Sequence, residues 1–194
     1  GNLLRKIIDK TETRYTSDIL SQLVAVEKDD GTSLRCNYDA FGRRITKELF
    51  YIKGKKKIPL SFSQAFYFGN HELGTLDEKE KIHELRVPGL SPRGISQASV
   101  AIEIGPKIYA PLHDISGNVI ALINPTTKTV VESYVFSAFA EEKIYDSNGT
   151  RIFRSAVGNP WRYKEKRIDE ETGLIYFGFR YYDTDARRWT SPDP

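Results

Sequence analysis

The sequence predicts an all-β protein in which antiparallel β-hairpins repeat along the chain and form a curved sheet. Its 194 residues include 11 Tyr, 10 Phe, 14 Gly and 9 Pro, a mixture typical of strands joined by tight turns. Several segments alternate apolar and polar residues, and an Asp-x-x-Gly spacing recurs between them. Because one hairpin cannot bury its own face, we expect each hairpin to lie beside the next.

The repeat is clearest at Tyr38–Arg44, which reads Tyr-Asp-x-x-Gly-Arg-Arg. An Asp side chain can bond the backbone two residues further on, and Gly three positions later accepts a positive φ without strain. Each copy therefore predicts a hairpin turn. The other copies, with their departures from the pattern, are Tyr145–Gly149, Asp114–Asn118 with His113 replacing Tyr, Asp18–Gln22 with Ser21 replacing Gly, and Phe136–Glu141 with Ala140 replacing Gly.

The strands between these turns are predicted by alternation and by turn dipeptides. The predicted strand, turn and strand series, in chain order, are Leu23–Lys28 before Asp30-Gly31, Val100–Ile104 and Lys107–Ala110 around Gly105-Pro106, and Val119–Ile123 and Thr129–Phe136 around Asn124-Pro125. These series predict antiparallel neighbours along most of the chain.

Two segments are less regular. Thr75–Leu85 could form a helix, because Thr75-x-x-Glu78 resembles a capping box, and the pattern leaves helical and non-helical structure equally open. Val87–Ser99 contains Pro88, Pro92 and glycines, which predicts a loop. We find no shift of composition between domains, so we expect one continuous β wall with a hairpin region at 1–158 and a distinct C-terminal motif at 159–194.

The C-terminal motif begins at Asn159-Pro160 and contains a strand-like run, Leu174–Tyr182, after the turn Thr172-Gly173. Acidic residues lie on both sides of this run, and Asp193-Pro194 follows it. This order resembles the core region of the RHS/YD-repeat family, and Tyr38–Arg44 resembles the repeat signature of that family.

The resemblance implies a function. In the family, this region closes a hollow β-shell around a toxic cargo and often carries a carboxylate pair that cuts the chain from the cargo. It implies that this chain is a shell segment of a polymorphic toxin and that its partners are the rest of its shell, a C-terminal toxin cargo and a secretion-apparatus protein. It also implies export as part of a larger bacterial protein.

The resemblance points to Asp169 or Glu170 and to Asp193 as the self-cleaving carboxylates, with Arg167 as the orienting cation. Two close carboxylates share a proton and can activate water or polarise a carbonyl. However, a three-stranded meander leaves Asp169 and Asp193 about 10 Å apart along the strand and about 10 Å across it. The residues alone also permit a solvated acidic turn in which Asp183 pairs with Arg180, Arg187 or Arg188.

The implied enzyme is at most a single-turnover aspartyl autoprotease in the full-length parent. We expect this chain to be a fragment without activity, since it has no Met and the printed sequence stops at Pro194. The alternative is a glycan- or protein-binding module without catalysis, whose recognition surface would be the aromatic strand Leu174–Tyr182. Core packing explains those aromatic side chains as well.

Other function classes find no support in the sequence. The three His are scattered and the only Cys, Cys36, lies in a strand-like run, so we expect no metal, no cofactor and a buried thiol. Phosphate-binding loops are absent. The 29 basic and 26 acidic residues nearly balance, and Lys53–Lys57 is expected to be a solvated loop rather than a nucleic-acid site. The longest apolar run, Val119–Ile123, is too short to span a membrane.

Overall fold

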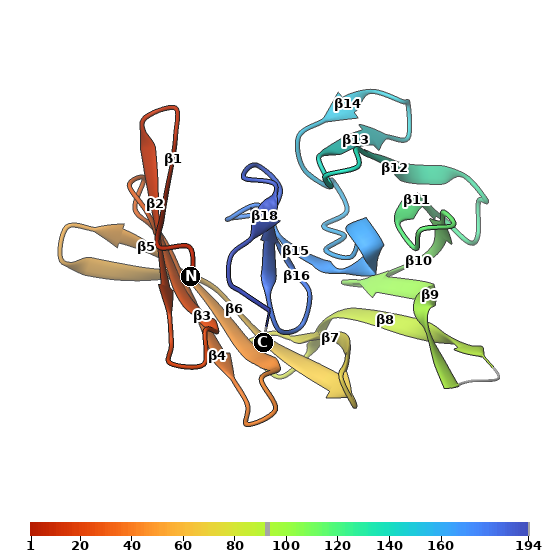
Figure 1. The fold of residues 1–194 in the computed structure, drawn as a ribbon. Helices are drawn as coiled ribbons and strands as arrows, with labels where there is room; N and C mark the ends of the chain where they lie inside the picture. The colour runs from red at the N-terminus through yellow and green to blue at the C-terminus, as the bar shows by residue number, and fades with distance from the viewer. Residues whose placement is uncertain (92–93, 194) are drawn as a thin grey trace. The chain divides into compact units, whose positions relative to one another are not determined.

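The computed structural model describes residues 1–91 and 94–193, and these form two compact units. The first unit comprises Gly1–Lys81, Tyr176–Asp183 and Arg188–Pro194. The second comprises Ile82–Ile175 and Thr184–Arg187. Figure 1 shows that both consist almost entirely of strands. None of the helical structure in the described residues is long and apolar enough to cross a membrane.

The first unit is an antiparallel sheet in which consecutive strands are neighbours. Its strands are β1 (Arg5–Ile8), β2 (Thr11–Ser17), β3 (Leu23–Lys28), β4 (Thr32–Tyr38), β5 (Arg44–Lys53), β6 (Lys56–Phe68) and β7 (His71–Leu76), with the short pair β17 (Tyr181–Asp183) and β18 (Arg188–Trp189) from the C-terminal motif.

The second unit repeats this arrangement with its own strands. They are β8 (Ile82–Ser91), β9 (Gly94–Ile104), β10 (Lys107–His113), β11 (Val119–Ile123), β12 (Val130–Phe136), β13 (Glu142–Asp146) and β14 (Arg151–Ile152), followed by the short 3₁₀ turn η1 (Tyr163–Glu165), β15 (Arg167–Asp169) and β16 (Leu174–Tyr176), whose last residue belongs to the first unit. The predicted antiparallel all-β class is confirmed.

A single turn geometry joins many of these hairpins. In the best repeat, the Asp39 carboxylate oxygen Oδ1 accepts the backbone N–H groups of Phe41 and Arg43, both at 2.9 Å, and Gly42 has φ +78°. The same pattern begins at Asp18, Asp77, Asp114 and Asp146, and Ser137 uses its hydroxyl oxygen in the same way. The predicted repeat is therefore confirmed, including its degenerate copies.

The copies without Gly place other residues in the left-handed region. Ser21 has φ +63°, Glu80 has φ +59° and Ala140 has φ +65°. A Cβ atom in this region costs about 1–2 kcal/mol per residue. The two hydrogen bonds to the Asp or Ser side chain hold the turn in this conformation despite the strain.

The helix permitted at Thr75–Leu85 does not form. Thr75 lies in β7, and Asp77 begins a repeat turn in which its carboxylate accepts the N–H groups of Lys79 and Lys81 at 2.8 and 2.9 Å. The Thr75-x-x-Glu78 spacing matches a capping box. However, the Asp77 side chain accepts backbone N–H groups and so stabilises a hairpin turn in place of a helix.

The loop expected at Val87–Ser99 is also wrong for most of its length, because β8 and β9 extend through it. Pro88 lies where the β8–β9 register shifts. Because the regular hydrogen bonding between the strands is interrupted there, the N–H that Pro88 lacks is not needed for pairing. Pro92, the other proline of this segment, lies outside the described residues.

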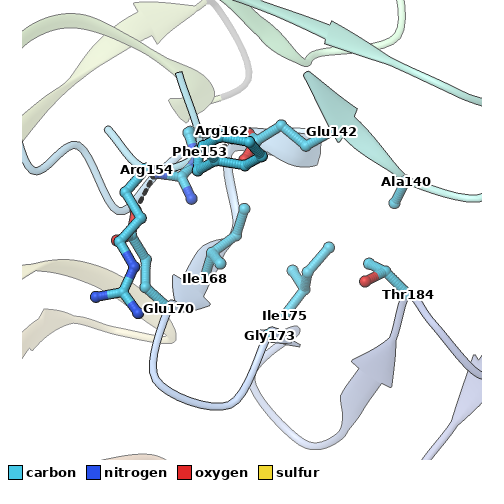
Figure 2. A pocket seen from close by; sticks show the side chains of 10 residues that line it. All are labelled: Ala140, Glu142, Phe153, Arg154, Arg162, Ile168, Glu170, Gly173, Ile175 and Thr184. Atoms are coloured by element: carbon cyan, nitrogen blue, oxygen red, sulfur yellow. Dashed lines mark hydrogen bonds and ion pairs between the residues drawn. The ribbon is translucent and has the colours of Figure 1, made fainter. Parts of the chain in front are cut away.

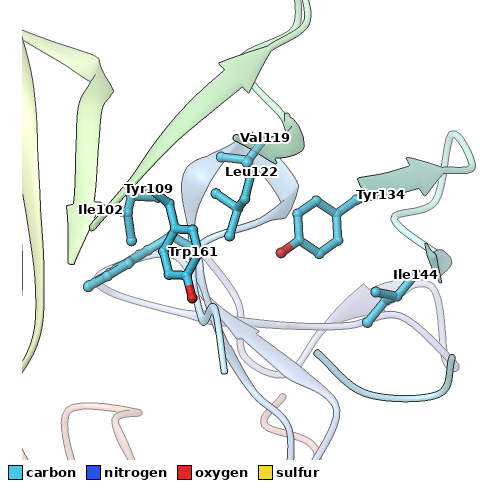
Figure 3. Packing of buried hydrophobic residues seen from close by; sticks show 7 residues of the cluster. All are labelled: Ile102, Tyr109, Val119, Leu122, Tyr134, Ile144 and Trp161. Atoms are coloured by element: carbon cyan, nitrogen blue, oxygen red, sulfur yellow. The ribbon is translucent and has the colours of Figure 1, made fainter. Parts of the chain in front are cut away.

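The core of the second unit collects apolar side chains from β9, β10, β11, β12 and β13 (Figure 3). Trp161, from the C-terminal motif, belongs to this core and is only 1% exposed. The cluster comprises Ile102, Tyr109, Val119, Leu122, Tyr134, Ile144 and Trp161. The motif thus buries the apolar face that the hairpins of this unit cannot bury themselves.

In the first unit, residues of the same motif enclose Arg44. Its guanidinium carbon lies 4.6 Å from the ring centre of Tyr176 and 5.7 Å from that of Tyr181. Its Nη1 donates to the Tyr181 hydroxyl at 2.9 Å, and its backbone N–H donates to the Tyr176 hydroxyl at 2.9 Å. Cys36 is buried, as predicted.

The strain at Glu80 gives a testable consequence. We expect Glu80→Gly to raise the free energy of unfolding by about 0.5–1 kcal/mol, because Gly removes the Cβ strain and loses part of that gain to chain entropy. The control is Glu78→Gly in the same turn, which only adds entropy to the unfolded chain and should lower stability. Urea denaturation measures both. Equal effects of the two substitutions would contradict the strain argument.

Candidate functional site

The C-terminal motif places charged side chains in the interior of the second unit. Arg162, Glu165, Arg167 and Asp169 are between 0 and 6% exposed. Burial of charge is costly unless each charge is paired and hydrogen-bonded. The partners of these groups therefore define what the motif can do.

Asp169 is the last residue of β15 and is fully buried. Its backbone carbonyl accepts the N–H groups of Thr172 at 3.0 Å and Gly173 at 2.8 Å, and Gly173 has φ +72°. The turn predicted at Thr172-Gly173 therefore begins at Asp169, three residues before Thr172. This geometry holds the Asp169 side chain inside the unit rather than in solvent.

Arg167 is buried against an acidic partner from β8. Its Nη2 lies 2.7 Å from Oε2 of Glu84, and its guanidinium carbon lies 5.0 Å from the ring centre of Trp161. The cation proposed to orient the carboxylates is thus engaged with Glu84, a residue that the sequence gave no reason to select.

Arg162 joins two carboxylates. Its Nη1 donates to Oε1 of Glu170 at 2.7 Å, while its Nε lies 2.8 Å from Oε1 of Glu142. The second contact is an ion pair without hydrogen-bond geometry, since both of those atoms are buried without a hydrogen-bond partner. The structure thus brings Glu170, one of the predicted acidic residues, together with another carboxylate and an arginine.

The electrostatics of this cluster follow from its burial. Burial raises the pKa of Glu142 above its usual value; Arg162 opposes this rise and the charge of Glu170 adds to it. Burial alone would lower the pKa of Arg162, but Glu142 and Glu170 outweigh it and raise the pKa. Arg162 therefore remains charged, and burial favours the protonated form of Glu142.

These groups line a pocket of about 180 Å³ (Figure 2). Glu142, Arg162 and Glu170 supply its charged side, and Ile168 and Ile175 supply apolar wall. The other lining residues are Ala140, Phe153, Arg154, Gly173 and Thr184. The pocket can hold a few water molecules or one small side chain next to the carboxylates.

Glu165 forms a second buried acidic centre. It accepts hydrogen bonds from the backbone N–H and the hydroxyl of Ser99, and its Oε2 lies 3.0 Å from Nε2 of His113. Glu165 and the preceding Lys164 have φ of +52° and +51°. Glu165 thus fixes a strained turn onto β9 and β10, which is a positioning role.

Asp193 belongs to the first unit, where its side chain is 84% exposed and its Oδ1 lies 2.5 Å from Nη2 of Arg180. Its neighbour Pro194 lies outside the described residues. Because Asp169 belongs to the other unit, a pairing of Asp169 with Asp193 stays a prediction. Asp183, expected to pair with an arginine, is buried and bonded to Nζ of Lys6 at 2.7 Å.

Sequence reasoning missed Glu84, Glu142, Arg162 and Glu165, which take part in the ion pairs described above. Glu84 and Glu142 lie outside the C-terminal motif, and no pattern within the motif singles out Arg162 or Glu165. The available signals were indirect: Glu142 directly follows a degenerate repeat turn, and Arg162 follows a Trp whose burial could be expected. Ion pairs between residues so distant along the chain require the register of the sheet, which the sequence does not display.

The chain is distantly homologous to RHS/YD-repeat toxin shell proteins. The chain is 29% identical to the tRNA nuclease WapA of Bacillus subtilis over 182 residues, covering 93% of this chain and 7% of WapA. It is 40% identical to the toxin subunit YenC1 of Yersinia entomophaga over 60 residues, covering 28% of this chain and 6% of YenC1. The chain therefore spans less than a tenth of these curated relatives. No family model matches.

Solved structures show the same fold. The TcdB2-TccC3 complex aligns with 94% of this chain and 9% of its own, with a TM-score of 0.62 and 20% identity. A TcdB2-TccC3-Cdc42 structure gives a TM-score of 0.63 at 18% identity, again over 94% of this chain. The match extends over nearly all of both units, so the likeness covers the hairpin repeats as well as the C-terminal motif.

The Arg162 cluster predicts a pH dependence of stability. A raised pKa in the folded state means that Glu142 contributes stability below its usual value of 4.5 and that this is lost as the pH rises through the raised value. We therefore expect Glu142→Gln to unfold like wild type near pH 4 and to be at least as stable near pH 7, as measured by urea denaturation.

The matched change on the other side of the ion pair is Arg162→Leu. It leaves Glu142 and Glu170 buried without their cation and should cost about 3–5 kcal/mol. A loss of stability in Glu142→Gln at neutral pH as large as that in Arg162→Leu would contradict this account.

Proposed function

From its distant homology to the RHS/YD-repeat toxin shell proteins over most of its length, we propose that this chain forms part of a β-shell wall that encloses a C-terminal effector. The observation that carries the proposal is the extent of the match, 93% of the chain to WapA and 94% to the TcdB2-TccC3 fold. Its partners would be the rest of its own shell, the enclosed cargo and a secretion-apparatus protein, and the parent would be exported.

The repeat turn supports this role physically. Each Asp-x-x-Gly turn returns the chain antiparallel to the previous strand, so a wall grows by one strand at a time without crossover connections. In the first unit, β1 pairs with β2 alone among the described strands, which leaves an edge to which further wall can be added. The hairpin region 1–158 would form wall, and the motif 159–194 would cover its face.

A protection experiment on the parent polypeptide tests the shell. We expect a C-terminal cargo to resist added protease in the wild type and to be digested in Leu122→Asp, because a charge in the second unit's core opens the wall. The control is Ile120→Asp on the same strand, at a side chain that is 37% exposed. Enclosure would be refuted if the cargo were digested as fast in the wild type as in Leu122→Asp. If the cargo is not protected and the protein binds a glycan array, a binding module is favoured instead.

The finer proposal is that the parent cuts itself once, using Asp169 or Glu170 with Asp193 and with Arg167 as orienting cation. In such a step, one carboxylate removes a proton from water, the water oxygen adds to a peptide carbonyl, and the other carboxyl protonates the leaving nitrogen. Two carboxylates in contrasting surroundings suit these two roles. Asp169 is fully buried and Asp193 is exposed, whereas Glu170 is only partly buried. Asp169 is therefore the better candidate of the two.

The test uses a polypeptide that carries the native residues after Pro194. We expect Asp193→Asn to abolish self-cleavage and Asp169→Asn to weaken it severely, since an amide supplies neither base nor acid. Glu170→Gln serves as the matched control and should still cut. Mass spectrometry follows the products, and circular dichroism verifies the fold. If both Asp variants cut themselves at the wild-type rate, Asp169 and Asp193 have a structural role only.

A further inference from the structure

The β5–β6 hairpin carries a strand edge that no described residue covers. β6 pairs with β5 from Lys56 to Gln64, but it pairs with β7 only from Gln64 to Phe68. Residues 56–63 therefore have one neighbouring strand in the part of the chain that the structure describes. Figure 1 shows this hairpin projecting beyond the strands beside it. Backbone groups on such an edge can pair with an added strand.

A pocket of about 340 Å³ lies beside this edge. Phe50 and Phe62 form its aromatic wall, and Pro59 and Ser61 come from the free edge itself. Glu78, from the turn after β7, lies at the other side, and Glu48 completes the lining. The pocket has the size and the apolar lining to take one aliphatic side chain from a strand laid along β6.

The charges around the edge select what can approach it. Lys55, Lys56 and Lys57 are all exposed at the tip, and Nζ of Lys57 lies 3.3 Å from the ring centre of Phe50. Lysines and proline on an edge repel indiscriminate strand pairing, and Pro59 also lacks an N–H to donate. A strand that carries carboxylates opposite these lysines would form ion pairs with them, so the same charges that repel other strands would select this one.

We propose that residues 56–63 form a docking edge for an acidic, extended segment of a partner polypeptide. The segment adds to β6 as a further strand, places an aliphatic side chain between Phe50 and Phe62, and sets its carboxylates against Lys55, Lys56 and Lys57. The Glu78 turn limits the groove at its inner end. None of the residues of this surface belongs to the C-terminal motif at 159–194.

The test uses the full chain and a short capped peptide in which Glu alternates with Val and Leu. We expect this peptide to bind, to protect the amides of residues 60–63 from hydrogen exchange, and to bind more weakly as salt is raised. A peptide with Lys in place of Glu should not bind. Calorimetry gives the affinities and exchange maps the site.

Lys56→Glu combined with Lys57→Glu should weaken binding roughly tenfold or more. The matched control is Lys107→Glu, an exposed lysine of the second unit, which should change nothing. The proposal is overturned if neither peptide binds, if both bind equally, or if protection falls elsewhere. It is also overturned if the chain alone dimerises with protection at 60–63, since the occupant would then be a second copy.

Discussion

The fold depends on a small set of hydrogen bonds repeated along the chain, in which one side-chain oxygen accepts two backbone N–H groups of a five-residue turn. In Asp114–Asn118, Oδ1 accepts the N–H groups of Ser116 and Asn118 at 2.8 and 2.9 Å. These bonds lower the pKa of Asp114 even though its partial burial would raise it. The carboxylate must be charged for the turn to be most stable. The turns at Asp39, Asp77 and Asp114, where the pKa is lowered, therefore lose stability as the pH falls from 3.8 through those lowered values.

The second constraint is the covering of the hairpin faces by the C-terminal motif, which uses buried arginines as well as aromatics. Arg162 and Arg167 are each paired with glutamates from the hairpin strands, Glu142 and Glu84. Such pairs add little net stability, because desolvation offsets their attraction. What they provide is position: a shifted strand register would leave one partner buried without the other. The aromatic packing around Trp161 supplies the stabilisation, and the ion pairs specify where the motif lies on the sheet.

The sequence predicted the features that local chemistry determines. The Asp-x-x-Gly turns, the antiparallel order and the burial of Cys36 follow from spacing and alternation. The errors arose where two local rules compete, as at Thr75–Leu85, where the turn-forming Asp77 prevailed over an apparent capping box. The charged cluster was largely unpredictable, because Arg162 meets Glu142 only through the register of β13 and the path of the motif. Glu170 was selected from the resemblance, but its partners were not.

Asp169 and Glu170 are neighbours in the chain, but the fold gives them different surroundings. Glu170 is bound to Arg162, whose guanidinium carbon lies 5.9 Å from the ring centre of Tyr134, so the charge of Glu170 helps to hold the fold. Asp169 lies at the end of β15, where its backbone carbonyl accepts two N–H groups of the following turn. That turn fixes the backbone at Asp169 and keeps its side chain in the interior of the unit. Two adjacent residues of one motif are thus held in different ways: Asp169 is enclosed by burial, and Glu170 is anchored by its ion pair with Arg162, so a shift of the motif along the sheet would disturb both.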